Sequence, residues 1–195
     1  MRLKTLALAA CATVSLALPA QAQMQQQQYN VFGFASLFGA PSGTVAGTAP
    51  TMRHTVAIDP KYKPGSIVVS TSERRLFYVT QPGTAIEYGV GVGREGFQWF
   101  GVKTVSAKKE WPSWTPPAQM LKRRPDLPRY MPGGIDNPLG ARAMYLGSSL
   151  YRIHGSNEPE TIGQAVSSGC IRMTNDDVTD LYNRVRVGAT VYVLR

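Results

Sequence analysis

Downstream of about residue 55, short apolar runs alternate with turn residues, which is the pattern of a chain built from strands. Residues 66–70 are rich in β-branched side chains, 72–74 mark a turn, and 76–80 resume the apolar pattern. Further runs lie at 86–92, 102–106, 143–146, 151–153 and 190–194. We therefore expect a mainly β fold, with one domain of ordinary size over residues 56–195.

One segment near the C-terminus has helical spacing instead. Thr174 or Asn175 can cap its start, and Asp176 and Asp177 suit the positive end of a helix dipole. Apolar residues then fall on one face: Val178, Leu181, Tyr182 and Val185. Gly188 is the expected stop. We expect this apolar stripe to pack against the core and to carry no chemistry.

Residues 110–139 differ from the rest because they hold two tryptophans, seven prolines and a basic run at 122–124. A long irregular insertion in a compact domain is usually a binding loop, a lid or a disordered segment. The aromatic residues favour a packed lid. The basic run at its centre is expected to be a solvated surface.

The N-terminus has the three parts of a secretory signal. Arg2 and Lys4 make a positive start, residues 6–18 are mostly apolar, and Ala20-Gln21-Ala22 supplies the small residues that a signal peptidase recognises. We expect a signal peptide over residues 1–22 and a protein exported to the periplasm or cell envelope. A membrane-anchoring helix is less favoured, because the apolar run is short for a bilayer.

Residues 23–55 have the composition of a flexible linker rich in Gln, Gly, Ser and Pro. The formal charge of the chain is +9, and it falls to +7 without the signal, since Arg2 and Lys4 leave with no acid. A basic balance favours an anionic partner. Nucleic acid is not expected for an exported chain without a recognition motif, so a cell-wall polymer or membrane surface fits better. An ordinary basic surface is the alternative.

Loss of the signal also removes Cys11, which leaves Cys170 as the single thiol. Lipidation at Cys11 is less favoured, because it would leave only a few apolar residues before the modified cysteine. Without Cys11 no intramolecular disulfide can form. An unpaired thiol in an oxidising compartment is a liability unless it is buried or used, so we expect Cys170 to be functional.

The segments around His154 and Cys170 carry the candidate chemistry. His54 falls in the expected linker, so His154 is the histidine available to the domain. A thiol is a good nucleophile only as a thiolate, and a neighbouring imidazole can take its proton. The carbonyl of Gly155 can fix the tautomer of that imidazole. An inert buried cysteine and a core histidine are the alternative that spacing alone leaves open.

The turn before the cysteine can assist acyl transfer. The N–H groups of Ser168 and Gly169, with that of Cys170, can form an oxyanion hole. Arg172 can hold a substrate carboxylate by a bidentate contact, although a structural ion pair is an alternative role. Ser167 and Tyr130 are further candidates for substrate binding.

These motifs closely resemble the L,D-transpeptidase catalytic domain (YkuD-type) family. The matching segments are Asn137-Pro138-Leu139-Gly140-Ala141-Arg142-Ala143, Arg152-Ile153-His154-Gly155-Ser156, Thr161-Ile162-Gly163 and Ser167-Ser168-Gly169-Cys170-Ile171-Arg172-Met173. The resemblance covers residues 64–195 and implies a β-sandwich of mixed sheets with few short helices. Many members have histidine where this chain has Ser168, which leaves His154, the histidine that the family uses as its base.

The resemblance implies a concrete reaction. Such enzymes attack the L,D peptide bond of a peptidoglycan tetrapeptide stem, release D-alanine and hold the stem as a thioester on cysteine. An amine of another stem then gives a 3→3 cross-link, an amine of an envelope protein gives anchoring, and water gives L,D-carboxypeptidation. No metal or organic cofactor is implied, and carbapenem sensitivity is expected.

Other thiol and metal enzymes fit less well. Sortases carry Thr-Leu-x-Thr-Cys, which is absent, and papain-like or NlpC-like peptidases place the cysteine before the histidine. Two histidines and one cysteine without His-Glu-x-x-His make a poor zinc site. A wall-binding module that has lost its chemistry is the non-enzymatic alternative, and the intact pair of His154 and Cys170 argues against it.

Overall fold

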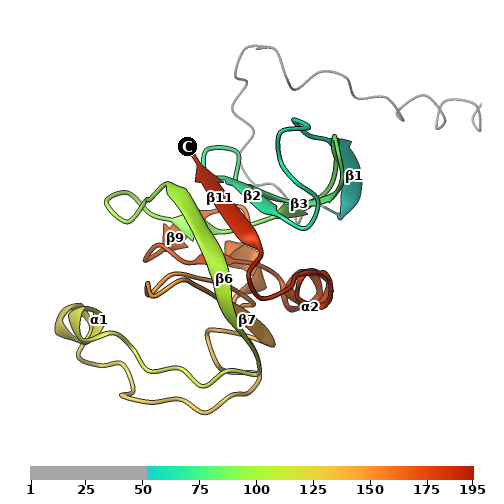
Figure 1. Ribbon diagram of the computed structural model, residues 1–195. Coiled ribbons are helices and arrows are strands. Elements are labelled where there is room, and N and C mark those ends of the chain that lie inside the picture. Colours follow the sequence, from blue (N-terminus) through green and yellow to red (C-terminus); the bar gives the residue numbers. More distant parts are fainter. Residues whose placement is uncertain (1–51) are drawn as a thin grey trace, which may run out of the picture. The chain divides into compact units, whose positions relative to one another are not determined.

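Strand pairing organises residues 52–195, the part of the chain that the computed structural model describes (Figure 1). The expected signal peptide and most of the expected linker lie outside the described residues. The strands are β1 His54–Ala57, β2 Ile67–Ser70, β3 Arg75–Gln81, β4 Thr84–Gly89, β5 Val92–Gly93, β6 Gly101–Glu110, β7 Arg142–Leu146, β8 Arg152–His154, β9 Ala165–Ser167, β10 Ile171–Arg172 and β11 Thr190–Leu194. The helices are α1 Ala118–Arg123, the 3-10 turn η2 Pro159–Thr161 and α2 Asn175–Arg184.

The strands form one large mixed sheet and a small second one. The large sheet has the order β1-β4-β3-β2-β11-β6-β7-β8-β10, and β5 pairs with β9. β2–β11, β8–β10 and β5–β9 are parallel, and the other pairs are antiparallel. The expectation of a mainly β fold with mixed sheets and few helices is confirmed.

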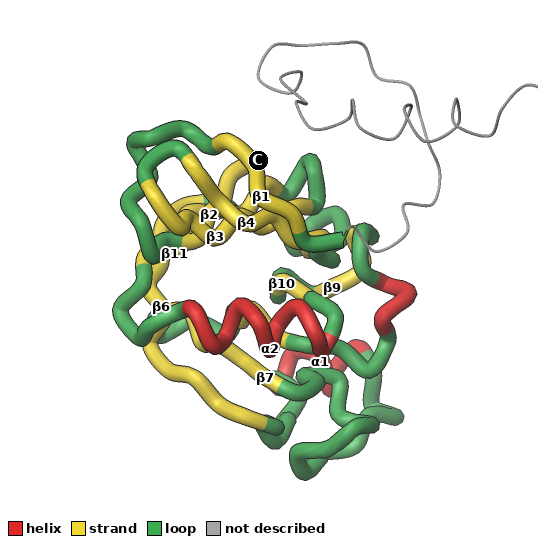
Figure 2. Tube along the Cα trace, turned by 90° about the vertical axis from the view of Figure 1, so that its right-hand side faces the viewer, coloured by secondary structure: helices red, strands yellow, loops and turns green. Residues whose placement is uncertain are grey.

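The long strand β6 turns the large sheet back over itself. Its first residues pair with β11 and its later residues pair with β7, with a register shift between Val105 and Ala107. Such irregularities bend a strand and let it pass between layers. Figure 2 shows β1–β4 and β11 on one side, with β7 and α2 on the other.

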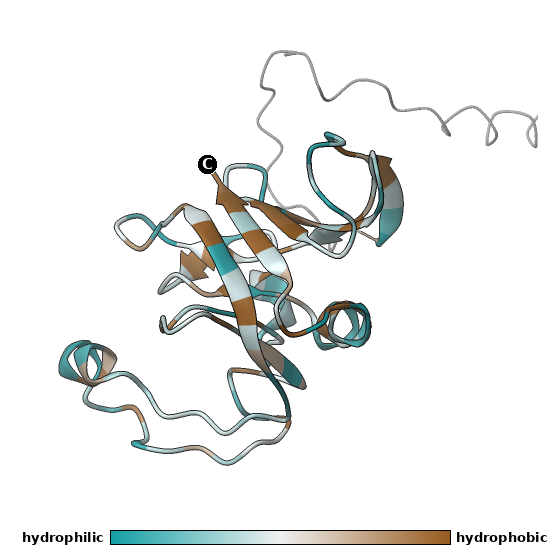
Figure 3. Ribbon diagram, in the orientation of Figure 1, coloured by the Kyte–Doolittle hydropathy of each residue, from teal (hydrophilic) through white to brown (hydrophobic). Residues whose placement is uncertain are grey.

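The core fills the space between these two layers. Ile67 and Leu76 come from the first layer, and Met144 and Ile153 come from the second, all fully buried. Along β11 the buried valines Val191 and Val193 alternate with Thr190 and Tyr192 (Figure 3), as expected for a strand with one buried face. Burial of each such side chain stabilises the fold by about 1.5–3 kcal/mol.

Most predicted strands are found close to their expected positions, and the departures have physical causes. The predicted run 86–92 divides, because β4 ends at Gly89 and Val92 pairs instead with β9. β6 extends to Glu110, past the predicted end at 106. The amine of Lys108 on β6 donates to the carbonyls of Tyr182 and Val185, at 2.6 and 2.7 Å. These hydrogen bonds join β6 to the C-terminal end of α2.

The predicted helix is α2, and its expected end is wrong. Thr174 caps the start, since its Oγ1 accepts a hydrogen bond from the Asp177 N–H at 3.1 Å. The helix ends at Arg184, because Val185 is already extended. Gly188 instead serves the following turn with a φ of +91°. Its N–H donates to the Val105 carbonyl, which joins the turn to β6.

Residues 111–139, which we call the lid, are an ordered excursion between β6 and β7 that carries α1 at its far end (Figure 1). Trp114 and Met131 exchange two backbone hydrogen bonds of 2.8 Å across its arms. The buried amide of Asn137 fastens the base, donating to the Pro132 carbonyl at 2.8 Å and accepting from the Leu139 N–H at 2.9 Å.

Three strands escaped sequence prediction. β1 includes His54, which the composition placed in the linker, and it pairs with β4 through four residues. β9 and β10 are only three and two residues long, too short for a periodicity. No helix within residues 52–195 is long and apolar enough to cross a membrane.

Candidate active site

Two short parallel strands present the candidate residues on one face. β8 pairs with β10 so that Ile153 lies opposite Ile171 and His154 lies opposite Arg172. The two isoleucines are buried in the core. Because side chains alternate across a strand, Arg152 and His154 share the opposite face of β8. Cys170 precedes β10 and shares that face with Arg172.

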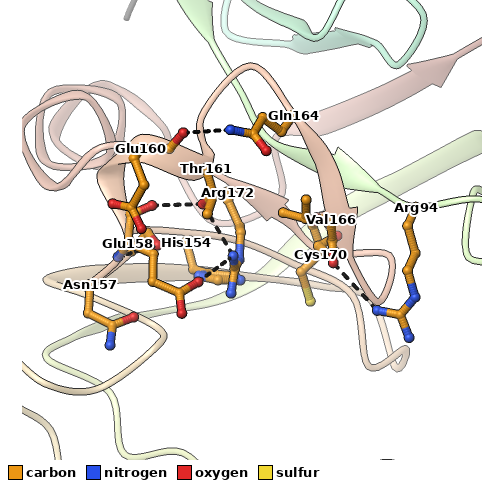
Figure 4. A network of polar contacts seen from close by, with 12 residues as sticks. Arg94, His154, Asn157, Glu158, Glu160, Thr161, Gln164, Val166, Cys170 and Arg172 are labelled. Atoms are coloured by element: carbon orange, nitrogen blue, oxygen red, sulfur yellow. Dashed lines mark hydrogen bonds and ion pairs between the residues drawn. The ribbon is translucent and has the colours of Figure 1, made fainter. Parts of the chain in front are cut away.

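This face forms the floor of a cleft of about 1050 Å³. One wall is the segment after β5, with Arg94 and Phe97, and another is the lid, with Trp114, Met120 and Arg123. Figure 4 shows Arg94 on one side of Cys170, with Arg172 and His154 on the other. The pairing of β8 with β10 therefore brings the two residues of the predicted pair into one cleft.

His154 is only 4% exposed and its ring is held by its neighbour. Nδ1 lies 2.5 Å from the Gly155 carbonyl oxygen. Since a carbonyl only accepts, Nδ1 carries the proton and Nε2 keeps its lone pair. Burial lowers the pKa of His154 to about 3, with smaller contributions from the nearby charges of Arg172 and Arg152. The imidazole is therefore neutral near pH 7 and able to accept a proton.

Cys170 is held as a neutral thiol. Its Sγ donates a long hydrogen bond of 3.7 Å to the carbonyl of Leu150. Burial raises the pKa of the Cys170 thiol, while hydrogen bonds and charge from Arg152 act in the opposite direction. The resting pair is thus thiol and imidazole rather than thiolate and imidazolium.

This protonation state gives a testable pH dependence. A raised thiol pKa leaves less thiolate at neutral pH than in a free cysteine, so alkylation of Cys170 by iodoacetamide should keep accelerating above the ordinary thiol range. No inflection is expected near pH 6.5, because the imidazole is already neutral there. Quantifying the modified Cys170 peptide by mass spectrometry from pH 5 to 11 measures the profile. A rate that is already at its plateau at pH 6 would contradict it by indicating a preformed ion pair.

The turn that carries the cysteine requires glycine at position 169. Gly169 has a φ of +105°, and a Cβ there would lie 2.6 Å from Cε1 of Tyr151. Trp99 stacks on Tyr151 with ring centroids 4.5 Å apart, and its Nε1 donates to the Gly169 carbonyl at 2.7 Å. The two aromatic rings therefore fix the turn from behind.

Ser167 braces the same turn internally. It is 6% exposed, its hydroxyl donates to the Cys170 carbonyl at 2.6 Å, and its oxygen accepts from the Gly169 N–H at 3.1 Å. Ser167 thus has a role in loop geometry, and because it also lines the cleft, its expected contact with substrate stays a prediction. The expected oxyanion hole changes too, because the Gly169 N–H is occupied. Within the described residues, the N–H groups of Ser168 and Cys170 have no protein partner.

The comparison with protein families decides what this arrangement belongs to. The model of the L,D-transpeptidase catalytic domain (YkuD) matches residues 64–193. The chain belongs to the L,D-transpeptidase family. The resemblance inferred from the motifs is thus confirmed. The probable L,D-transpeptidase ErfK/SrfK of Escherichia coli K12 is 41% identical over 137 residues, which are 66% of this chain and 43% of that protein. The chain therefore spans less than half the length of this relative.

Solved structures agree with the fold. A Brucella melitensis crystal structure, named for a probable carnitine operon oxidoreductase, is 44% identical with a TM-score of 0.50, and the match covers 74% of this chain and 94% of that one. That name describes the Brucella protein alone. L,D-transpeptidase 3 of Mycobacterium tuberculosis, in complex with a faropenem-derived adduct, shares the fold at 18% identity and a TM-score of 0.52, over 67% of this chain and 60% of that one.

In this family member the side chain of Arg172 is already engaged. Its Nη1 donates to Glu158 Oε2 at 3.0 Å and to Thr161 Oγ1 at 3.2 Å, and the side chain is 17% exposed (Figure 4). The structural ion pair that was the alternative role of Arg172 is therefore present, and it occupies Nη1. Tyr130 is 60% exposed and is not among the residues that line the cleft, so its expected contact with substrate is not supported.

Four arginines of this L,D-transpeptidase cleft were not predicted from the sequence, namely Arg94, Arg123, Arg124 and Arg152. Arg94 Nη1 lies 3.4 Å from Ser168 Oγ. The guanidinium groups of Arg94 and Arg123 lie 4.2 and 5.1 Å from the ring centroid of Phe97, so part of the basic run expected to be solvated belongs to the cleft. Arg152 lies on the face of β8 that carries His154. The signal was present for this residue alone, because strand alternation places it on the same face as His154.

Proposed function

We propose that this family member is an exported peptidoglycan L,D-transpeptidase that uses Cys170 as its nucleophile and His154 as its base. The observation that carries the proposal is the placement of both residues on one face of β8 and β10, in one cleft. The stem peptide is the donor. The signal-like N-terminus supports export to the periplasm or cell envelope, where this donor is found.

The proposed reaction follows from the protonation states. His154 Nε2 takes the Cys170 proton while the sulfur attacks the carbonyl carbon of the L,D peptide bond, so the S–H bond breaks as the C–S bond forms. The N–H groups of Ser168 and Cys170 receive the developing oxyanion, in place of the pair first expected. His154 then returns the proton to the departing D-alanine amine. The stem remains as a thioester until an amine acceptor attacks it.

The charge of the cleft supports an anionic donor. Arg94 and Arg123 stand on two walls and Arg172 on the floor, while Glu158 is paired with Arg172. Stem peptides carry free carboxylates, and guanidinium groups bind carboxylates in a bidentate geometry. We propose that these arginines orient the donor, with Arg172 binding through the nitrogens that Glu158 leaves available.

Sensitivity to β-lactams follows from the same nucleophile. A carbapenem or penem offers a strained acyl group to which the Cys170 sulfur can add. The Mycobacterium tuberculosis relative with a faropenem-derived adduct supports this expectation for the fold. Carbapenem treatment should therefore add the mass of the drug to the Cys170 peptide.

Purified tetrapeptide muropeptides test the proposal. We expect D-alanine release together with dimers linked 3→3 when a second stem supplies the amine. Liquid chromatography with mass spectrometry identifies these products. Tripeptides alone would replace transpeptidation with L,D-carboxypeptidation. A folded protein that releases no D-alanine and forms no β-lactam adduct would contradict the enzyme proposal in favour of a wall-binding module.

A further inference from the structure

Arg152 on β8 is a neighbour of Cys170, the proposed nucleophile, on the adjacent chain segment that leads into β10. The β8–β10 register pairs Ile153 with Ile171, so continuing it by one residue places Arg152 beside Cys170. Adjacent strands are about 4.8 Å apart. The backbone of Arg152 therefore lies beside that of Cys170, as the backbone of Arg172 lies beside that of His154.

A shared acceptor joins the two side chains. Arg152 Nη1 donates to the Leu150 carbonyl at 3.0 Å, and the Cys170 thiol donates to the same oxygen at 3.7 Å. When the thiol loses its proton, the sulfur no longer donates to this carbonyl. The guanidinium that shares the carbonyl then stands next to a negative sulfur.

Arg152 also lacks an acidic partner. Within the described residues it takes part in no ion pair, whereas Arg172 pairs with Glu158 and Arg142 pairs with Glu110. Its Nε is buried without a hydrogen-bond acceptor, and its guanidinium lies 5.2 Å from the ring centroid of Tyr145. A partly buried cation without a counterion is costly. A thiolate at Cys170 would supply that counterion.

We propose that Arg152 is the counterion of the Cys170 thiolate and stabilises it as His154 takes the proton. This inference rests on the proposed role of Cys170. The S–H bond breaks, an N–H bond forms at His154 Nε2, and the negative sulfur is held between the guanidinium of Arg152 and the imidazolium of His154. Arg152 thereby lowers the cost of ionising a thiol whose surroundings otherwise favour the neutral form.

Other charged groups face the thiol from neighbouring elements. His154 lies on β8, Arg172 lies on β10 beside Glu158, and Arg94 follows β5. The remaining charged residues of the cleft lie in the lid. They are Arg123, the last residue of α1, Arg124, which follows it, and Asp136 near the base of the lid. Among them Arg152 has the closest place in the sheet to Cys170, so its removal should have the largest effect on ionisation.

The test compares Arg152→Gln, Arg152→Met and Arg152→Lys with wild type. Iodoacetamide is uncharged and needs no stem peptide, so its rate against pH reports ionisation of Cys170 in the full chain, with the Cys170 peptide quantified by mass spectrometry. Loss of an adjacent opposite charge moves a pKa by about one unit or more. We expect either neutral variant to alkylate about tenfold more slowly at pH 8, with the profile shifted to higher pH, and Arg152→Lys to retain most of the rate.

Arg142→Gln is the matched control. Arg142 lies on the adjacent strand β7, also has a buried Nε without an acceptor, and does not line the cleft. Its variant should keep the wild-type profile. Equal profiles for wild type and a folded neutral Arg152 variant, or an equal shift in Arg142→Gln, would overturn the proposal. Because alkylation needs no substrate, a failure of D-alanine release would count against the proposed function and leave this result unchanged.

Discussion

Replacement of Cys170 by alanine should lower D-alanine release by at least about 10³-fold, the scale on which enzymes lose activity with their nucleophile. The melting temperature should stay within a few degrees of wild type, since the thiol is partly exposed and makes one long hydrogen bond to Leu150. Chromatographic assay of D-alanine and a thermal melt measure the two quantities. The β-lactam adduct should disappear in the same variant.

Cys11→Ala is the matched control for this substitution. It makes the same chemical change in the expected signal peptide, so activity should remain at the wild-type level. Activity retained in Cys170→Ala would exclude the thiol as nucleophile. A large fall in its melting temperature would instead give the cysteine a structural role.

Replacement of His154 by glutamine should lower kcat by about 10²- to 10⁴-fold, the usual contribution of a positioned general base. The glutamine amide occupies the place of the imidazole Nε2, but it cannot take the thiol proton. KM should change little, because His154 acts on the proton rather than on the stem. Steady-state kinetics with a tetrapeptide stem measure both constants.

His54→Gln provides the control, because His54 is the other histidine of the chain and lies on β1 outside the cleft lining. Its kinetic constants should match those of wild type. A His154→Gln variant with wild-type kcat would show that another group accepts the proton.

The sequence predicts those parts of this fold that depend on regular patterns. Runs of β-branched and apolar residues located strands such as β2 and β11, and the apolar stripe with its cap located α2. β9 and β10 are too short to show a period in the sequence. They form strands because they pair with β5 and β8, which only the folded chain brings beside them. The end of α2 was misplaced, because the backbone is already extended at Val185, three residues before Gly188.

The residues of the candidate site also fall into those that the sequence can indicate and those whose roles depend on the folded chain. Motif and chemistry singled out Cys170 and His154 as candidates, and the fold places both of them in one cleft. The roles of Ser167 and Arg172 depend on partners that only the folded chain supplies, namely the Cys170 carbonyl and Glu158. Tyr130 was proposed from its residue type alone, and its exposed side chain in the lid gives that prediction no support.

The turn that carries Cys170 joins β9 to β10, and these strands belong to different sheets. The proposed nucleophile is thus anchored at both ends by the core, whereas the lid is fastened near its own base, by Asn137 and by the pairing of Trp114 with Met131. The two parts can therefore diverge separately in evolution. Insertions and substitutions between residues 115 and 130 can change which molecules reach the cleft while the reactive sulfur keeps its place. Variety among acceptors can arise in this way on an unchanged chemical centre.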